Sequence, residues 1–109
     1  MIIGYVRWFD SAKGYGFIQT IPKPGESALE IFAHYKDILG EGHLALGNGC
    51  VVAFDVEQNE KGKVAKNITM DVEEKLLVEC ADALAGLVKK FGLKVKDRRC
   101  RSGDNYENQ

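Results

Sequence analysis

The strongest constraint on the fold of this chain lies in residues 13–18, Lys-Gly-Tyr-Gly-Phe-Ile. A cation and two aromatic rings occupy alternate positions there. In an extended strand alternate side chains lie on one face, so Lys13, Tyr15 and Phe17 are predicted to share a side. The intervening glycines give the opposite face little to bury, which favours a sharp bend or a close approach of backbone. The pattern therefore predicts a strand with a ring-bearing surface.

Two further aromatic groups flank this stretch. Trp8 and Phe9 are adjacent, so a regular strand cannot place both on one face, and we expect a bulge or a strand end to re-aim one. Downstream, the alternation in residues 31–35 places Phe32 and His34 on one face and smaller apolar residues on the other. Bases stack on exposed rings and cations meet phosphates. The segments together predict a surface for unpaired nucleic acid.

Alternation and turn residues predict five short strands in the first two thirds of the chain. We expect them at residues 4–9, 13–20, 30–35, 51–57 and 63–70. In the fourth strand, Val52, Phe54 and Val56 are predicted to point inward. A set of short strands with no long helix between them favours a small barrel.

Two families of nucleic-acid binders carry paired aromatic strands of this kind. The RNA-recognition motif begins similarly, but Thr20 stands where its last aromatic belongs, and Pro22 and Pro24 occupy the region of its first helix. The cold-shock domain, a five-stranded barrel of the oligonucleotide-binding type, fits instead. Residues 2–71 resemble that family in four segments: Trp8-Phe9-Asp10, residues 13–18, Ile31-Phe32-Ala33-His34-Tyr35 and Ala65-Lys66-Asn67-Ile68.

The resemblance implies an all-β fold, a five-stranded antiparallel barrel that binds single-stranded RNA or DNA. It also implies a protein that holds strands unpaired, as an RNA chaperone or a transcription antiterminator does. The chain departs from the family at Asp10, where Asn is usual, at Ala33, where Val is usual, and in a longer loop at 19–30. Every stacking ring is kept. Carried over by position, the binding residues would be Trp8, Phe9, Lys13, Tyr15, Phe17, Phe32, His34 and Tyr35.

Catalytic or metal chemistry finds little support in the residues. His34 and His43 are the two histidines, and neither is paired by spacing with a nucleophile and an acid. The chain has no phosphate-binding glycine loop of the P-loop type. Cys50, Cys80 and Cys100 match no zinc or redox spacing, so we expect reduced thiols. The sequence therefore predicts a binding protein, not an enzyme, without cofactor or metal.

Charge is divided unevenly along the chain, which has a net charge of −1. Residues 1–71 hold seven Lys or Arg and nine Asp or Glu, so stacking must supply most of the affinity, at roughly 1–3 kcal/mol per base. Residues 89–101, by contrast, carry a net charge of +6. They form either a solvated tail or a basic arm that contacts phosphates or another acidic partner. Candidate phosphate contacts are Arg7, Lys61, Lys63, Lys94, Lys96, Arg98, Arg99 and Arg101.

The spacing of apolar residues changes after residue 71, which indicates an additional element after the predicted barrel. Between residues 72 and 91 apolar residues recur three or four apart, which predicts one amphipathic helix about 30 Å long. Asp71 and Glu74 are spaced as in a capping box at its start, and Gly92 suits the position just past its end. We therefore expect a cold-shock domain at 1–71, a helix at 72–92 and a basic, flexible tail at 93–109.

The apolar stripe of this helix has two candidate partners. It can pack on the side of its own barrel, or it can form a homodimer, since Leu77, Leu84 and Phe91 repeat every seven residues. The homodimer would imply an alternative function, in which the chain is a protein-interaction or dimerisation module that uses the barrel as a scaffold. No apolar run reaches the roughly 20 residues of a membrane helix, and no secretion signal opens the chain. We expect a cytoplasmic protein with no membrane partner.

Overall fold

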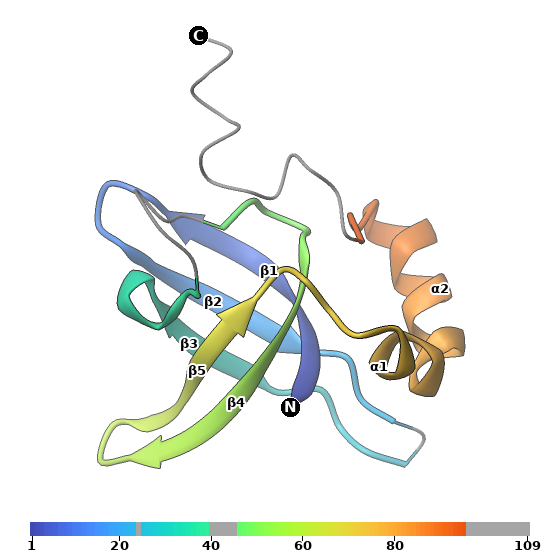
Figure 1. The fold of residues 1–109 in the computed structure, drawn as a ribbon, viewed down its shortest axis with the longest axis horizontal. Coiled ribbons are helices and arrows are strands. Elements are labelled where there is room, and N and C mark those ends of the chain that lie inside the picture. The colour runs from blue at the N-terminus through green and yellow to red at the C-terminus, as the bar shows by residue number, and fades with distance from the viewer. Residues whose placement is uncertain (24, 40–45, 96–109) are drawn as a thin grey trace, which may run out of the picture.

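The computed structural model describes residues 1–23, 25–39 and 46–95 of the chain. Its five strands close into a barrel in the spatial order β1-β2-β3-β5-β4, with two helices after it (Figure 1). The predicted barrel followed by a helical element is confirmed. In chain order the elements are β1 (Ile2–Asp10), β2 (Tyr15–Thr20), β3 (Glu30–His34), the 3₁₀ helix η1 (Tyr35–Asp37), β4 (Val51–Asn59), β5 (Gly62–Thr69), α1 (Glu74–Glu79) and α2 (Ala81–Phe91).

Strand pairing is antiparallel at four of the five seams between the described strands, as expected. At the remaining seam β3 and β5 run parallel and pair at Phe32 and Val64. The chain after η1 extends this seam, since Ile38 forms a parallel bridge with Ile68. Closing the barrel in this way removes the free sheet edges that an open sheet would expose.

One apolar cluster fills the barrel interior. In β2 the burial alternates, so that Gly16 and Ile18 point inward while Tyr15 and Phe17 point outward. Every strand contributes to the interior in the same way. Its buried members are Val6, Ile18, Ile31, Ala33, Ile38, Leu46, Cys50, Val52, Phe54, Ala65 and Ile68.

A second apolar cluster lies outside the barrel wall and joins it to α1 and α2. The barrel contributes the outward side chains of Ile3 and Val51, and the helices contribute Leu84. In addition, the Tyr5 ring stacks on the Phe91 ring with 6.0 Å between centroids. The helices accordingly lie along one side of the barrel (Figure 1). Two partners were predicted for the apolar stripe of the helices, and in the structure the stripe packs on its own barrel.

The helical region differs from the predicted single helix. It breaks at Cys80, whose φ of −119° and ψ of 24° leave the helical range. The break turns Cys80 into the second cluster, where only 4% of it is exposed. Glu73, not Asp71, is the N-cap of α1, and no side chain caps it. The predicted end at Gly92 is confirmed, because Gly92 has a φ of 68° and donates to the Val88 carbonyl at 2.8 Å.

The fourth strand keeps its predicted alternation, but its burial ends before Val56. Val52 and Phe54 point inward and are fully buried, as expected. Val56 pairs with the buried Ala65 and so lies on the predicted inner face, but 37% of it is exposed. The strand runs past the buried part of the barrel at this point, since the residues that follow Val56 in β4 are exposed as well.

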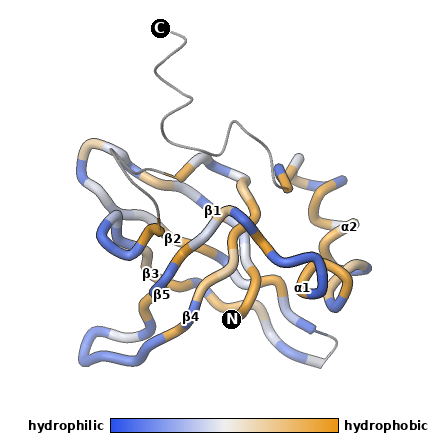
Figure 2. Tube along the Cα trace, viewed as in Figure 1, coloured by the Kyte–Doolittle hydropathy of each residue, from blue (hydrophilic) through white to orange (hydrophobic). Residues whose placement is uncertain are grey.

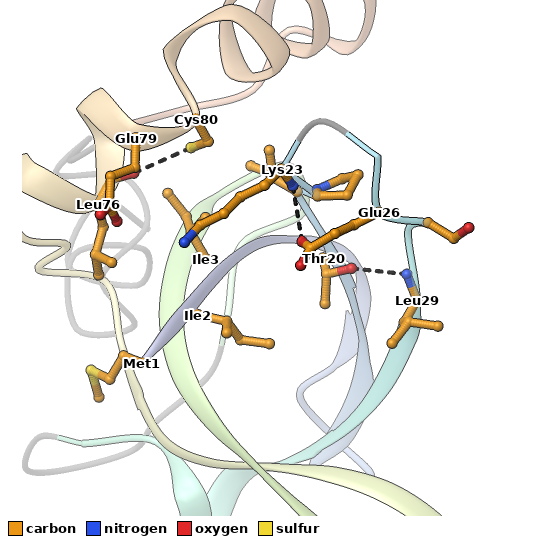
Figure 3. A pocket seen from close by; sticks show the side chains of 13 residues that line it. Met1, Ile2, Ile3, Thr20, Lys23, Glu26, Leu29, Leu76, Glu79 and Cys80 are labelled. Carbon is orange, nitrogen blue, oxygen red and sulfur yellow. Dashed lines mark hydrogen bonds between the residues drawn. The ribbon is translucent and has the colours of Figure 1, made fainter.

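One of the cysteines departs from the reduced thiol that was expected. Cys50 is disulfide-bonded, whereas a reduced thiol was predicted; Cys100 lies outside the described residues. Cys80 is a free, buried thiol, and burial raises its pKa above the usual value. It lines a cavity of about 520 Å³ between the start of β1, the loop after β2 and α1 (Figure 3).

No helix in the described part of the chain is both long enough and apolar enough to cross a membrane.

Candidate nucleic-acid interface

Four aromatic rings meet on the outer face of β1, β2 and β3. Trp8 pairs across the strands with Phe17, and Phe17 pairs with Phe32. The ring centroids of these pairs lie 5.5 and 5.7 Å apart. Tyr15 closes the group, at 6.0 Å from Trp8 and 5.8 Å from Phe32. We call Trp8, Tyr15, Phe17 and Phe32 the ring surface.

A bulge in β1 turns Trp8 onto this surface. The pairing shifts between Val6, opposite Ile18, and Trp8, opposite Phe17. Trp8 therefore comes to lie on the outer face, where 40% of it is exposed. The bulge that was expected from the adjacent Trp8 and Phe9 is therefore present, and it lies just before Trp8. Phe9 pairs with Gly16 and packs, half-buried, against the inner cluster.

Two glycines permit the close contacts that hold the surface together. A Cβ on Gly16 would overlap the Trp8 carbonyl oxygen and lie 2.7 Å from the Cα of Phe9. Gly14 has a φ of 83°, and a Cβ there would lie 2.7 Å from the Tyr35 ring. The close approach of backbone predicted from these glycines is confirmed at Gly16, whereas Gly14 makes room for the Tyr35 ring and supplies the left-handed φ of the turn.

Lys13 lies in the turn between β1 and β2, outside the strand in which it was predicted. The turn is held by Asp10, whose Oδ1 accepts hydrogen bonds from the backbone N–H groups of Ala12 and Lys13, both at 3.0 Å. Such an Asx-turn suits Asp and Asn equally. The acidic residue that departs from the family pattern therefore has a structural role. The Lys13 side chain remains exposed, two residues before Tyr15.

His34 and Tyr35 extend the ring surface toward η1. His34 pairs with Tyr15 across β2 and β3, so its ring shares the outer face. Its Nδ1 accepts a hydrogen bond from the Lys36 N–H at 3.3 Å and caps η1. The neutral imidazole then carries its proton on Nε2, which leaves an N–H donor for a ligand. Tyr35, 43% exposed, lies 4.7 Å from His34 between ring centroids.

The predicted phosphate contacts are spread over the molecule. Arg7, in the β1 bulge, is exposed and donates to Gln19 Oε1 at 2.6 Å. Lys61 and Lys63 belong to the hydrophilic hairpin between β4 and β5 (Figure 2). Lys94 follows α2 and is half-buried. The remaining predicted cations, Lys96, Arg98, Arg99 and Arg101, lie outside the described residues, as does His43.

The structure thus brings together most of the predicted stacking residues and separates Phe9 from them. It also adds one residue that the sequence analysis missed. Gln19 pairs with Tyr5 on the outer face of β2, two residues after Phe17. The alternation that identified Tyr15 and Phe17 points to Gln19 as well, and its amide offers both a donor and an acceptor beside the rings.

No group of three or more His, Cys, Asp or Glu side chains in the described ranges is arranged to hold a metal ion.

Comparison with known proteins places this chain in a family. The family model described as the 'Cold-shock' DNA-binding domain matches residues 2–70, so the match ends before α1. The Major cold shock protein of Streptococcus pyogenes is 44% identical over 69 residues, which cover 63% of this chain and 96% of that protein. Cold shock protein ScoF of Streptomyces coelicolor is 42% identical over 69 residues, 63% of this chain and 97% of that protein. Cold shock-like protein CspC of Escherichia coli is 37% identical over 68 residues, 62% of this chain and 93% of that protein. The chain belongs to the cold-shock domain family.

Proposed function

We propose that this protein binds single-stranded RNA or DNA and holds it unpaired by stacking bases on the ring surface. The observation that carries the proposal is the group of four outward rings whose neighbouring centroids lie 5.5–6.0 Å apart on three adjacent strands. A continuous platform of rings accepts any base, because every base has a π face. Membership of the cold-shock domain family supports the same function.

Stacking carries most of the affinity in this proposal, since the barrel itself has no excess of positive charge. At roughly 1–3 kcal/mol per base, four stacked bases supply on the order of 4–12 kcal/mol before the cost of ordering the strand. Lys13, Lys61 and Lys63 contribute phosphate contacts from exposed positions around the barrel. His34 and Tyr35 add polar and aromatic contacts at the η1 end. Phe9, from the inner face, supports the platform rather than joining it.

Binding of the open strand alone would shift the equilibrium between paired and unpaired nucleic acid toward the unpaired form. This is the physical basis for an RNA chaperone or an antiterminator of transcription, acting in the cytoplasm on nascent or structured strands. No residue is assigned a catalytic role. The alternative, a dimerisation module, has less support, because the helical stripe that would form the dimer packs on its own barrel.

The proposal predicts a loss of binding when single rings are removed. Phe17→Ala and Phe32→Ala should each weaken the binding of a short pyrimidine strand by about 1–3 kcal/mol, because each removes one stacking platform. Fluorescence or anisotropy titration measures the affinity. Val78→Ala is the matched control, since Val78 is 66% exposed on α1 and makes no part of the ring surface. Unchanged affinity in both Phe variants would exclude the ring surface as the site.

A further inference from the structure

A groove opens next to the ring surface, where the appended helices meet the barrel. It encloses about 510 Å³ between β1, the turn at residues 48–49 and the end of α2. Tyr5 and Arg7 line it from the barrel, and Phe91 and Lys94 line it from the helical region. The helical wall lies beyond residue 70, where the family match ends. The groove is therefore a feature of this chain that a barrel alone would not have.

The groove and the ring surface are joined along β1. Tyr5 and Trp8 both lie on the outer face, opposite Gln19 and Phe17 respectively, and are separated by about 10 Å of strand. Arg7 lies between them in the bulge, and its guanidinium donates to Gln19 Oε1. A nucleic-acid strand that stacks on Trp8 and continues toward Tyr5 would therefore pass Arg7 first and then reach the groove.

The groove offers the same chemistry as the ring surface. Phe91 covers Tyr5 with its rings stacked at 24°, yet 54% of Phe91 remains exposed. The Lys90 Nζ lies 5.3 Å from the centre of that ring. None of the described residues that line the groove is acidic, while Arg7 and Lys94 are basic. A half-exposed ring with cations beside it accepts a base and its neighbouring phosphates once the long Lys90 side chain, which lies over the ring, moves aside.

We propose that a bound single strand continues from Trp8 past Arg7 into this groove, where a base stacks on Phe91 and phosphates contact Arg7 and Lys94. This inference rests on the proposed function and extends it, since it assigns to the appended helix a second nucleotide subsite. The occupant is the same RNA or DNA strand that covers the ring surface. Long strands should therefore bind more tightly than strands just long enough to cover the four rings.

The test compares two oligothymidine strands, of about 5 and about 12 nucleotides, within the range of sites used by single barrels of this type. Phe91→Leu keeps an apolar side chain over Tyr5 but removes the ring. It should weaken binding of the longer strand about fivefold or more and leave the shorter strand unaffected. Phe91→Trp, which restores a ring, should bind both strands as the parent does. Val78→Ala serves as the control in the same helical region, and thermal unfolding checks that each variant is folded.

Charge-removing variants test the same path separately. Arg7→Gln and Lys94→Gln should each lower the salt slope for the longer strand by about 0.7, the value for one phosphate contact on single strands. Equal binding of the longer strand by the parent and Phe91→Leu, with unchanged salt slopes, would overturn the inference. In that case Phe17→Ala would still weaken both strands if the proposed function is right. If Phe17→Ala also left the affinity for both strands unchanged, the proposed function itself would be contradicted.

Discussion

The Asp10 carboxylate holds the turn between β1 and β2 while it places a negative charge beside a surface that we propose binds a polyanion. Its Oδ1 accepts two backbone N–H groups, a role that an Asn side chain fills equally well. A neutral amide oxygen can accept the same two bonds, so the negative charge is not required for the geometry of the turn. At this position turn stability and ligand affinity can therefore be separated.

We predict that Asp10→Asn keeps the melting temperature of the parent and strengthens single-strand binding a few-fold, because a repulsive charge is removed. Asp10→Ala should instead lower the free energy of unfolding by about 1 kcal/mol, since two N–H groups of the turn lose their acceptor. Thermal unfolding and strand titration measure the two effects. Weaker binding by the Asn variant would show that the carboxylate assists the ligand.

Residue types alone located most of the ring surface. Alternation placed Tyr15 and Phe17 on one face and Phe32 on the facing strand, and the period of two is a property of any strand. The family resemblance implies that Phe9 belongs to the same surface, while the residues themselves show that a bulge is needed near Trp8 but not which residue it displaces. That choice depends on the packing of Gly16 against β1, which appears only when the strands are paired.

At the scale of elements, the outer face of β1 and β4 differs from that of an ordinary small barrel because it is buried. Strands of a small barrel commonly bury one face and expose the other. Here Val51 and Ala53 are as deeply buried on the outer face as Val52 and Phe54 are inside, each 1% exposed or less. The α1–α2 pair provides this cover. Its packing, rather than helix propensity, should account for most of the stability of the helices.

Leu84 is the α2 residue with which this prediction is best tested. It is 8% exposed and packs in the second cluster, so Leu84→Ala should lower the free energy of unfolding by about 2–5 kcal/mol. Val78→Ala, at a position 66% exposed in the neighbouring helix, should change it by less than about 0.5 kcal/mol. Chemical denaturation gives both values. A small effect at Leu84 would mean that the helices contribute little to the fold.

Sequence patterns predicted the strands and the amphipathic stripe but not where they are interrupted. The stripe continues through Cys80 with unbroken spacing, so nothing in the residue types marks the end of α1 at Glu79. The exposure of Val56 is a related case, because the alternation of β4 continues through it while the barrel no longer covers that end of the strand. Periodicity reports which face a residue prefers, while interruptions are decided by the partner element.

At the scale of the whole molecule, the helical region divides the outer wall of the barrel into a covered side and an open side. The covered side carries Tyr5 and Val51 beneath the helices, and the open side carries the ring surface. Removing residues 72–109 would uncover a contiguous apolar area on the first side. Exposed apolar patches of this kind promote association.

We therefore predict that the fragment 1–71 melts at a lower temperature than the full chain and self-associates, while a short strand still binds through Phe17. Thermal unfolding and size-exclusion chromatography test the first part, and titration with the short strand tests the second. A fragment that is as stable and monomeric as the full chain would show that the helices are an independent addition.

Trp8 lies within the ring surface and is the only tryptophan, so its fluorescence reports directly on stacking there. Titration with a short pyrimidine single strand at low and high salt is the most direct measurement of the central claim. We predict strong quenching with an affinity that changes little with salt, because rings supply most of the binding. Quenching that disappears at high salt would assign the binding to phosphate contacts, at about 0.7 in salt slope for each. Absence of both quenching and binding at either salt would contradict nucleic-acid binding by this surface.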